Sequence, residues 1–397
     1  MIKGRDIVVI GIQAWDIEIG SNCKNIATEF ARYNRVLYVN PPLDRATLKR
    51  EANTEKVMKR IQIQKGLQKD LVSIGENLWN LYPKNRIESI NWLPSHSLFK
   101  VLNKRNNRLF AKNIRSAMER LDFKDVLLFN DSSMFLGFHL KELLPISFYT
   151  YYMRDYLIKV PYWKRHGERM EPQLIKKADV VVNNSTLYAE YGAKFNKNSF
   201  MVGQGCDLSL FNDEGNNIPI PAEFTNIPRP IIGYVGYLTG MRLDIGLLEY
   251  MAQKNKDWSI VLVGPEDEAF RNSALHEMDN VYFLGSKDSK ELPAYVKGFD
   301  IAMNPQVVND WTIGNYPRKI DEYLAMGKPV LATHTKAMEM FQNHVYLAET
   351  KEDYIALAQR ALKENSSELI KSRIAFAKSH TWENNVGAIY EAIQKSA

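Results

Sequence analysis

The sequence has 397 residues and a formal net charge of +6, with 45% hydrophobic, 25% charged and 11% aromatic residues. A chain of this length exceeds what one hydrophobic core normally supports, so two globular domains are expected and global disorder is excluded. The early apolar run, residues 6–12, is too short for a signal-peptide core or a membrane span. The only cysteines, Cys23 and Cys206, indicate a reducing compartment such as the cytoplasm, and we expect two inert buried thiols.

The first half of the chain predicts a parallel sheet flanked by helices. Its strand-like runs lack clean alternation of apolar and polar residues, which is typical of strands buried on both faces. The expected strands are residues 6–12, 35–39, 125–129, 146–152 and 179–184.

Two loops of this half follow strands and contain candidate binding residues. Gly20 and Ser21 open a helix and are placed to approach a phosphate or an acceptor, although Gly20 is equally well explained as a turn residue. The spacing around them is not G-x-G-x-x-G, which disfavours a dinucleotide oxidoreductase. Arg154 and Asp155 follow the strand at 146–152 among several aromatic residues, so they form either part of an acceptor pocket or an ordinary buried ion pair.

The basic charge lies in the first half of the chain. Residues 1–227 contain 33 Lys and Arg and 24 Asp and Glu, whereas the remainder has 19 and 22. The densest basic stretch, within residues 92–115, also contains Trp92, Leu98 and Phe99. This composition suits an anionic membrane surface and a solvated helix face equally well, and without an accompanying motif it disfavours nucleic acid.

A proline-rich linker separates this half from a second α/β unit. We expect an N-terminal domain over 1–207, a linker over 208–229, a second domain over 230–378 and a final helix over 379–397. The second domain's expected strands are residues 230–236, 258–264, 281–285, 299–304, 329–333 and 345–348. Two doubly wound, Rossmann-like domains would face each other across a cleft, with ligands at the carboxyl ends of the strands.

The segment NYPRKIDEYLAMGKPVLAT, residues 315–333, predicts a helix that starts at Pro317 and ends near Met326, with Gly327 as its cap. The residues at helical spacing on its packing face are Ile320, Tyr323 and Leu324. Glu322 lies off that face, so it either pairs with Arg318 or Lys319 or accepts hydrogen bonds from ligand hydroxyls. The amides of Gly314, Asn315 and Tyr316 are predicted to hold the phosphate of the same ligand.

This segment resembles the donor-binding motif of retaining glycosyltransferases with the GT-B fold, particularly family four and its teichuronic acid-type members. The matching positions of the motif P-x-K-x-x-E-Y-x-A-x-G-x-P-V are Pro317, Lys319, Glu322, Tyr323, Ala325, Gly327, Pro329 and Val330. Shorter similarities extend along most of the chain, from residues 35–42 to 379–393. The resemblance implies transfer of a sugar from a nucleotide-diphosphate donor to a glycan or lipid-linked acceptor, with retention, in surface polysaccharide biosynthesis.

The resemblance also implies roles for individual residues. Glu322 would bind the nucleotide ribose, and Arg242 and Lys319 would act in catalysis by stabilising the donor diphosphate. Gly236 would lie in the same donor site, and Gly264, Pro265 and Glu266 would lie near the base. Arg242 has a competing explanation in a salt bridge to Asp244.

The chain departs from the motif at its first acidic position, where Gly314 stands and Asp310 is the nearest substitute. This departure leaves the transferred sugar open. Glu171 occupies the place of a glutamate seen in relatives, without an assigned chemical role.

The sequence contains no D-x-D and no histidines at metal-ligand spacing, so we expect metal-independent chemistry without a cofactor. The expected partners are a nucleotide sugar, an acceptor and an anionic membrane surface at the inner face, and not nucleic acid. Two alternatives stay open: a nucleotide-sugar epimerase of the same fold, and a noncatalytic subunit that binds nucleotide or glycan.

Overall fold

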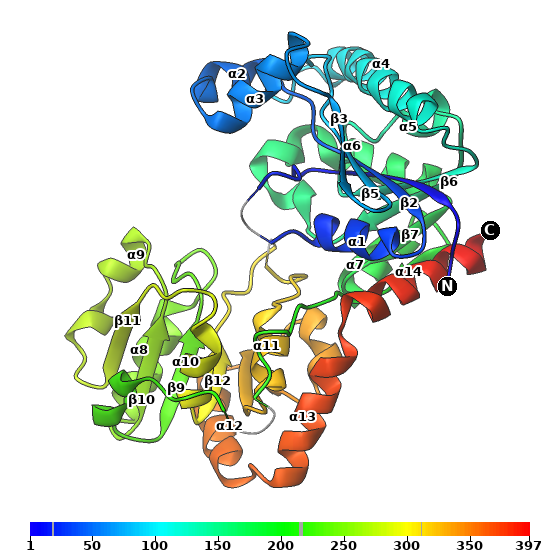
Figure 1. Ribbon diagram of the computed structural model, residues 1–397. Coiled ribbons are helices and arrows are strands. Elements are labelled where there is room, and N and C mark those ends of the chain that lie inside the picture. The colour runs from blue at the N-terminus through cyan, green and yellow to red at the C-terminus, as the bar shows by residue number, and fades with distance from the viewer. Residues whose placement is uncertain (18–19, 214–216, 311) are drawn as a thin grey trace. The chain divides into compact units, whose positions relative to one another are not determined.

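The computed structural model describes residues 1–17, 20–213, 217–310 and 312–397 (Figure 1). The chain divides into two compact units. Unit 1 comprises Met1–Gly205 and Trp382–Ala397, and unit 2 comprises Cys206–Thr381. The segment expected as a linker, 208–229, belongs to unit 2.

Unit 1 contains an eight-stranded sheet with the order β3-β4-β2-β1-β5-β6-β7-β8. All neighbouring strands are parallel except β3, which runs antiparallel to β4. The strands are β1 (Asp6–Gly11), β2 (Arg35–Val39), β3 (Leu71–Gly75), β4 (Leu78–Leu81), β5 (Val126–Asp131), β6 (Ile146–Met153), β7 (Val180–Asn183) and β8 (Ser199–Met201). The order reverses between β1 and β5, so the switch point lies at their carboxyl ends.

Helices cover both faces of this sheet. They are α1 (Asn22–Ala31), α2 (Arg45–Glu51), α3 (Glu55–Gln64), α4 (His96–Arg120), α5 (Leu140–Leu143), η1 (Leu157–Lys159), α6 (Pro161–Lys177), α7 (Thr186–Ala193) and α14 (Trp382–Ser396). Side-chain caps fix several of their starts: Ser95 accepts a hydrogen bond from the amide of Leu98 at the start of α4, for example.

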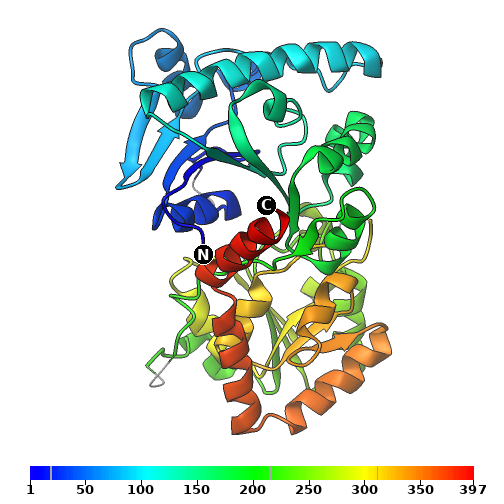
Figure 2. The same cartoon turned by 90° about the vertical axis from the view of Figure 1, so that its right-hand side faces the viewer.

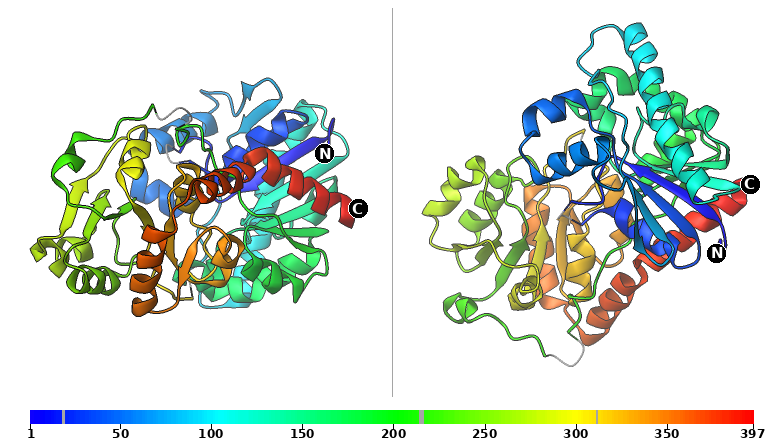
Figure 3. Two further views of the ribbon diagram at one scale, coloured as in Figure 1. Left: turned by 90° about the horizontal axis from the view of Figure 1, so that it is seen from below. Right: turned by 45° about the horizontal axis from the view of Figure 1, so that its top comes forward.

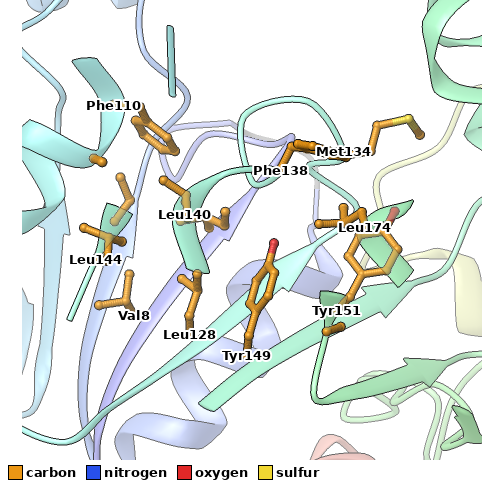
Figure 4. Packing of buried hydrophobic residues seen from close by; sticks show 14 of the residues in the cluster. Val8, Phe110, Leu128, Met134, Phe138, Leu140, Leu144, Tyr149, Tyr151 and Leu174 are labelled. Carbon is orange, nitrogen blue, oxygen red and sulfur yellow. The ribbon is translucent and has the colours of Figure 1, made fainter. Parts of the chain in front are cut away.

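Alternate residues of the strands build two cores. Val8 and Ile10 pack with residues of α4 and α6 on one face, whereas Ile7 and Val9 pack with α1 and α14 on the other. Figure 4 shows Val8, Leu128 and two tyrosines of β6 projecting into the first core. In the second core, the ring of Tyr390 in α14 stacks on Phe30 of α1 at 5.4 Å. These two helices lie beside each other in Figure 3.

Unit 2 contains an entirely parallel six-stranded sheet with the order β11-β10-β9-β12-β13-β14. The strands are β9 (Ile231–Val235), β10 (Ser259–Val263), β11 (Val281–Gly285), β12 (Ile301–Asn304), β13 (Val330–Thr333) and β14 (Tyr346–Ala348). The helices are η2 (Ala222–Asn226), α8 (Ile245–Lys254), α9 (Glu268–Arg271), η3 (Ala274–Glu277), α10 (Leu292–Gly298), α11 (Lys319–Ala325), η4 (Lys336–Phe341), α12 (Lys351–Lys363) and α13 (Ser367–Ser379).

As in unit 1, alternate residues of the strands build two cores in unit 2. Val235 and Val261 pack with α10 and α11, and Ile232 and Leu262 pack with α8 and α12. Both units are therefore doubly wound, as the strand patterns predict. Both cysteines are free and buried, as expected.

Candidate functional site

The carboxyl ends of β9 and β10 bring two glycines of unit 2 into contact. The Gly236 amide donates to the Val263 carbonyl at 2.9 Å. Both glycines have positive φ, 141° at Gly236 and 150° at Gly264, and a Cβ on Gly264 would lie 1.9 Å from the Gly236 carbonyl oxygen. No larger residue fits at Gly264 without moving the backbone, so the two loops form one continuous edge.

Helix α11 is attached to this edge by two side chains of the predicted motif. The Tyr323 hydroxyl accepts a hydrogen bond from the Val235 amide at 2.9 Å, at the last residue of β9. The Lys319 ammonium donates to the Tyr234 hydroxyl and lies 3.9 Å from the centre of that ring. A Cβ on Gly236 would lie 2.9 Å from Lys319 Nζ, so a positive charge stands beside the loop after β9.

Glu322 lies in the same helix and is half-buried. Burial raises the pKa of its carboxyl, and the charges of Arg318 and Lys319 oppose that shift. Among the described residues, no ion pair or hydrogen bond reaches the carboxylate, so the expected alternative of a pairing with Arg318 or Lys319 is not realised. A partly desolvated carboxylate without a partner is suited to accept hydrogen bonds from a ligand's hydroxyl groups.

The structure corrects two details of the predicted motif. Helix α11 begins at Lys319 with Arg318 as its cap, two residues later than expected, and the Ile320 amide donates to the Pro317 carbonyl in a tighter turn. The Asn315 amide donates to the Thr312 carbonyl at 3.0 Å and is occupied within its own loop. Gly314 is buried in this loop. The side chain of Lys319 is therefore a better phosphate contact than the Asn315 amide.

A buried carboxylate that sequence reasoning missed fixes this loop. Asp321, fully buried in α11, accepts from the Tyr316 hydroxyl at 2.7 Å and contacts His380 Nδ1 at 2.7 Å. Burial raises the pKa of Asp321, and its hydrogen bonds from His380 and Tyr316 oppose that shift. The His380 carbonyl also accepts from the Cys206 amide at 2.8 Å. Asp321 thus joins the loop before α11 to both ends of unit 2.

Replacing Asp321 with asparagine is expected to reduce the free energy of unfolding by about 1–3 kcal/mol, because a buried donor of Tyr316 or His380 loses a charged acceptor. Urea-induced unfolding of the full chain, followed by circular dichroism, measures the change. The matched control is Asp257→Asn, an exposed aspartate of the same unit. Equal stabilities of the two variants would show that Asp321 contributes nothing through these bonds.

The remaining candidates of unit 2 lie in the loops after β9, β10 and β12. Arg242 is exposed, and Asp244 caps α8 by accepting from the Leu247 amide at 2.9 Å. The Pro265 carbonyl accepts from the Leu238 amide at 2.9 Å, and Glu266 contacts His276 Nε2 at 2.8 Å. Asp310 is exposed. A backbone hydrogen bond thus joins the loop of Gly236 to the loop of Glu266.

In unit 1 the candidate residues meet at the switch point of the sheet. Arg154 donates to Asp131 at 2.9 Å, to Asp155 at 2.9 Å and to Gln13 at 3.4 Å. Ser21 caps α1 and donates to the same Gln13 side chain at 2.6 Å. Gly20 is exposed. Arg154 therefore forms the expected ion pair with Asp155 and a second, unpredicted one with Asp131.

A pocket of about 670 Å³ opens at the same edge of unit 1. Its walls come from the carboxyl ends of β1, β2 and β5, from the inner side of α4 and from the start of α6. Aromatic side chains line part of it, including Trp92, Tyr162 and Trp163, together with the cations Arg50 and Arg165. Aromatic faces and charged hydrogen-bonding groups suit a sugar or an amphiphile with a polar head.

Glu171 is buried in α6, where its Oε1 accepts from the Tyr151 hydroxyl at 2.8 Å. Burial raises the pKa of Glu171 to about 7, and the Tyr151 hydrogen bond opposes the shift.

The described residues contain no group of three or more His, Cys, Asp or Glu side chains placed to hold a metal ion. In the parts of the chain that the structure describes, no helix combines the length and apolar composition needed to cross a bilayer.

Comparison with known proteins adds an independent finding for unit 2. Residues 229–364 match the family described as glycosyl transferases group 1. The chain contains a group 1 glycosyl transferase domain. This domain includes the joined glycine loops, Lys319 and Glu322, so the resemblance drawn from the motif at 315–333 is confirmed.

Similar proteins agree with the group 1 domain, although the chain spans only about 60% of the length of the curated relative that it matches. A Bacillus subtilis protein described as a teichuronic acid biosynthesis glycosyltransferase, TuaH, is 28% identical over 243 residues, which cover 57% of this chain and 60% of TuaH. Among solved structures, the sucrose-phosphate synthase of Thermosynechococcus elongatus has a TM-score of 0.64 at 17% identity, and the match covers 99% of this chain and 100% of that one. HepE of Anabaena, solved with UDP, has a TM-score of 0.65 at 13% identity and coverages of 98% and 100%. These likenesses confirm the predicted GT-B fold.

Proposed function

We propose that this protein is a glycosyltransferase that takes a sugar from a nucleotide-diphosphate donor bound to its group 1 domain. The observation that carries the proposal is the position of Lys319 beside Gly236 at the carboxyl end of β9, with the unpartnered Glu322 carboxylate on the same short helix, α11. Lys319 supplies a cation for the diphosphate, and Glu322 accepts hydrogen bonds from the ribose hydroxyls. The UDP bound in the HepE structure makes a uridine nucleotide the first donor to test.

The proposed reaction transfers a hexosyl group with retention and needs no metal ion or cofactor. The acceptor oxygen attacks the anomeric carbon from the side on which the diphosphate leaves, and a diphosphate oxygen takes the acceptor's proton. Arg242 and Lys319 stabilise the charge that develops on the leaving diphosphate. Stabilisation of this kind by fixed cations is among the largest contributions to catalysis in water-excluded sites.

The acceptor is proposed to bind unit 1, in the pocket of about 670 Å³ whose rim includes Trp92 and Tyr162. A glycan or lipid-linked acceptor of surface polysaccharide biosynthesis fits that lining, and the similarity to TuaH supports the same class. The enzyme would then work on the cytoplasmic face of a membrane. Ser21, Arg154 and Asp155 form a polar group at the sheet's switch point that helps to orient the acceptor.

Gly314, in place of an acidic residue, favours a second candidate: a noncatalytic subunit that binds a nucleotide sugar. The two functions differ in turnover and not in nucleotide binding. Hydrolysis or transfer of a bound donor would identify the enzyme, whereas tight nucleotide binding without any donor turnover would identify the binding subunit.

Titration calorimetry with UDP, GDP and ADP tests the donor site. Glu322→Gln is expected to weaken binding of the preferred nucleotide by about 10- to 100-fold, because the neutral amide loses charge-assisted hydrogen bonds to the ribose. Glu339→Gln, at an exposed position of the same unit, is the matched control and should bind like the wild type. Absence of binding by all three nucleotides, or equal affinities of both variants, would contradict the proposed site.

A further inference from the structure

Helix α4 presents a strongly basic outward face. The helix contains seven basic residues and a single acidic one, Glu119 near its end. All the basic residues are exposed: Lys100, Lys104, Arg105, Arg108, Lys112, Arg115 and Arg120. Figure 2 shows α4, in cyan, along the outer edge of unit 1. The helix places Arg105, Arg108 and Lys112 at spacings of three and four residues, which aligns them on one stripe.

Most of these charges are not neutralised within unit 1. Arg120 pairs with Asp70 at 2.9 Å, and Arg115 donates to the Leu143 carbonyl. Among the described residues, the other five make no ion pair. A row of unpaired cations repels itself and creates a positive potential over this face, which an anionic partner would relieve.

Exposed apolar side chains continue the same stripe at the start of the helix. Leu98 and Val101 precede Arg105 on it and are 47% and 67% exposed. Trp92, in the loop before α4, and Tyr162, in the first turn of α6, are 68% and 62% exposed. The Trp92 indole donates to the Ser89 carbonyl at 2.8 Å, which holds the ring in place while its surface stays uncovered. Amphipathic aromatic rings in such positions suit the boundary between water and lipid.

We propose that the outward face of α4, with Trp92, Leu98, Val101 and Tyr162, is a docking surface for an anionic lipid bilayer. The cations match the charge of the lipid head groups, and the apolar side chains enter the interface beside them. A soluble polyanion would use the cations alone and would leave four large apolar side chains exposed to water. The juxtaposition of both features therefore favours a bilayer.

The docking surface adjoins the pocket of unit 1. Trp92 and Tyr162 belong to both, and the buried side of α4 contributes Asn103 and Asn106 to the pocket wall. A docked unit 1 would open this pocket beside the head-group layer. This part of the inference rests on the proposed function and names the acceptor class: an amphiphile with a lipid tail, whose polar head is taken up from the membrane surface.

Flotation of the full chain with lipid vesicles tests the docking surface without requiring any substrate. Binding is expected to phosphatidylcholine vesicles that contain phosphatidylglycerol, not to phosphatidylcholine alone, and should be weakened by high salt. The triple variant Lys104→Glu, Arg108→Glu, Lys112→Glu is expected to bind about 100-fold more weakly. The matched control reverses three exposed lysines of unit 2, Lys256, Lys363 and Lys371, to glutamate and should bind like the wild type.

Four outcomes would overturn the proposal. If the wild type and the α4 triple variant bind the vesicles equally, this face of α4 is not the docking surface. If the control variant loses as much vesicle affinity as the α4 variant, the loss comes from the change in net charge and not from this face. Binding to heparin as tight as to the anionic vesicles, with neither affinity changed by Trp92→Ser and Val101→Ser, would assign the face to a soluble polyanion. Calorimetry with UDP on the same preparations separates the proposed donor site from the proposed docking surface. A protein that binds the nucleotide but not the vesicles would overturn the docking surface and leave the donor site standing.

Discussion

Replacing Lys319 with alanine is expected to lower kcat for sugar transfer by about 100- to 1,000-fold, because the leaving diphosphate loses a fixed cation in the transition state. The ammonium is held in place by Tyr234, whose hydroxyl accepts from it and whose ring lies 3.9 Å away. A preorganised charge of this kind needs little rearrangement during the reaction. Initial rates over a range of donor concentrations measure the effect, with release of nucleoside diphosphate as the signal.

Whether the substitution changes kcat or KM shows how Lys319 acts. A loss in kcat with a small change in KM places the contact in the transition state, whereas a rise in KM alone makes Lys319 a ground-state binding residue. Lys371→Ala, which removes an exposed lysine from the same unit, is the control for net charge. Unchanged kinetics in Lys319→Ala would remove this residue from the proposed mechanism.

The free energy of unfolding of the wild type is expected to decrease as the pH rises because of Glu171, and replacing Glu171 with glutamine should remove this decrease. Burial raises the pKa of Glu171 from 4.5 to about 7, so the folded chain keeps a proton that the unfolded chain has already released. The stabilisation is complete below the unfolded value and disappears as the pH passes the folded value. At about 1.4 kcal/mol per pH unit, the wild type loses about 3 kcal/mol that the neutral variant does not.

Urea-induced unfolding at several values between pH 4.5 and 8 measures this difference. The free energy of unfolding of the wild type should fall relative to that of Glu171→Gln as the pH rises. The variant keeps the hydrogen bond, because the Tyr151 hydroxyl can still donate to its amide oxygen. Glu168→Gln changes an exposed glutamate of the same helix and should follow the wild-type profile. Parallel profiles of wild type and Glu171→Gln would mean that the buried carboxyl does not retain its proton.

The sequence was sufficient to predict the apolar parallel strands of both sheets but not the strands at the two edges of the unit 1 sheet. Strands such as Arg35–Val39 and Val281–Gly285 are apolar runs of a length typical of parallel strands, and they were predicted at their observed bounds. The edge strands of that sheet, β3 and β8, are short and contain no fully buried residue, so their residues lack the continuous apolar pattern. Strand β4 was missed with its antiparallel partner β3.

The same limit applies to the candidate site. Lys319, Glu322 and Tyr323 lie in one local motif, so their proximity could be predicted. The contact of Asp321 with His380 joins residues 59 positions apart in the chain and has no local signal. Asp131 was missed although it ends a parallel strand, the position at which ligand-contacting residues are expected. A systematic search of strand ends would have found it.

The way in which unit 1 is assembled from both ends of the chain has a consequence for biosynthesis. Helix α14 covers one face of its sheet, and Tyr390 and Ile393 fill a core with Phe30 and Ile26. A ribosome makes these partners more than 350 residues apart, as the hydrogen bond from Asn34 to Tyr390 illustrates. Unit 2, which is continuous in sequence, can fold first, whereas the nascent unit 1 exposes an apolar face until its last helix has been synthesised. Chaperones would therefore be expected to engage that face during translation.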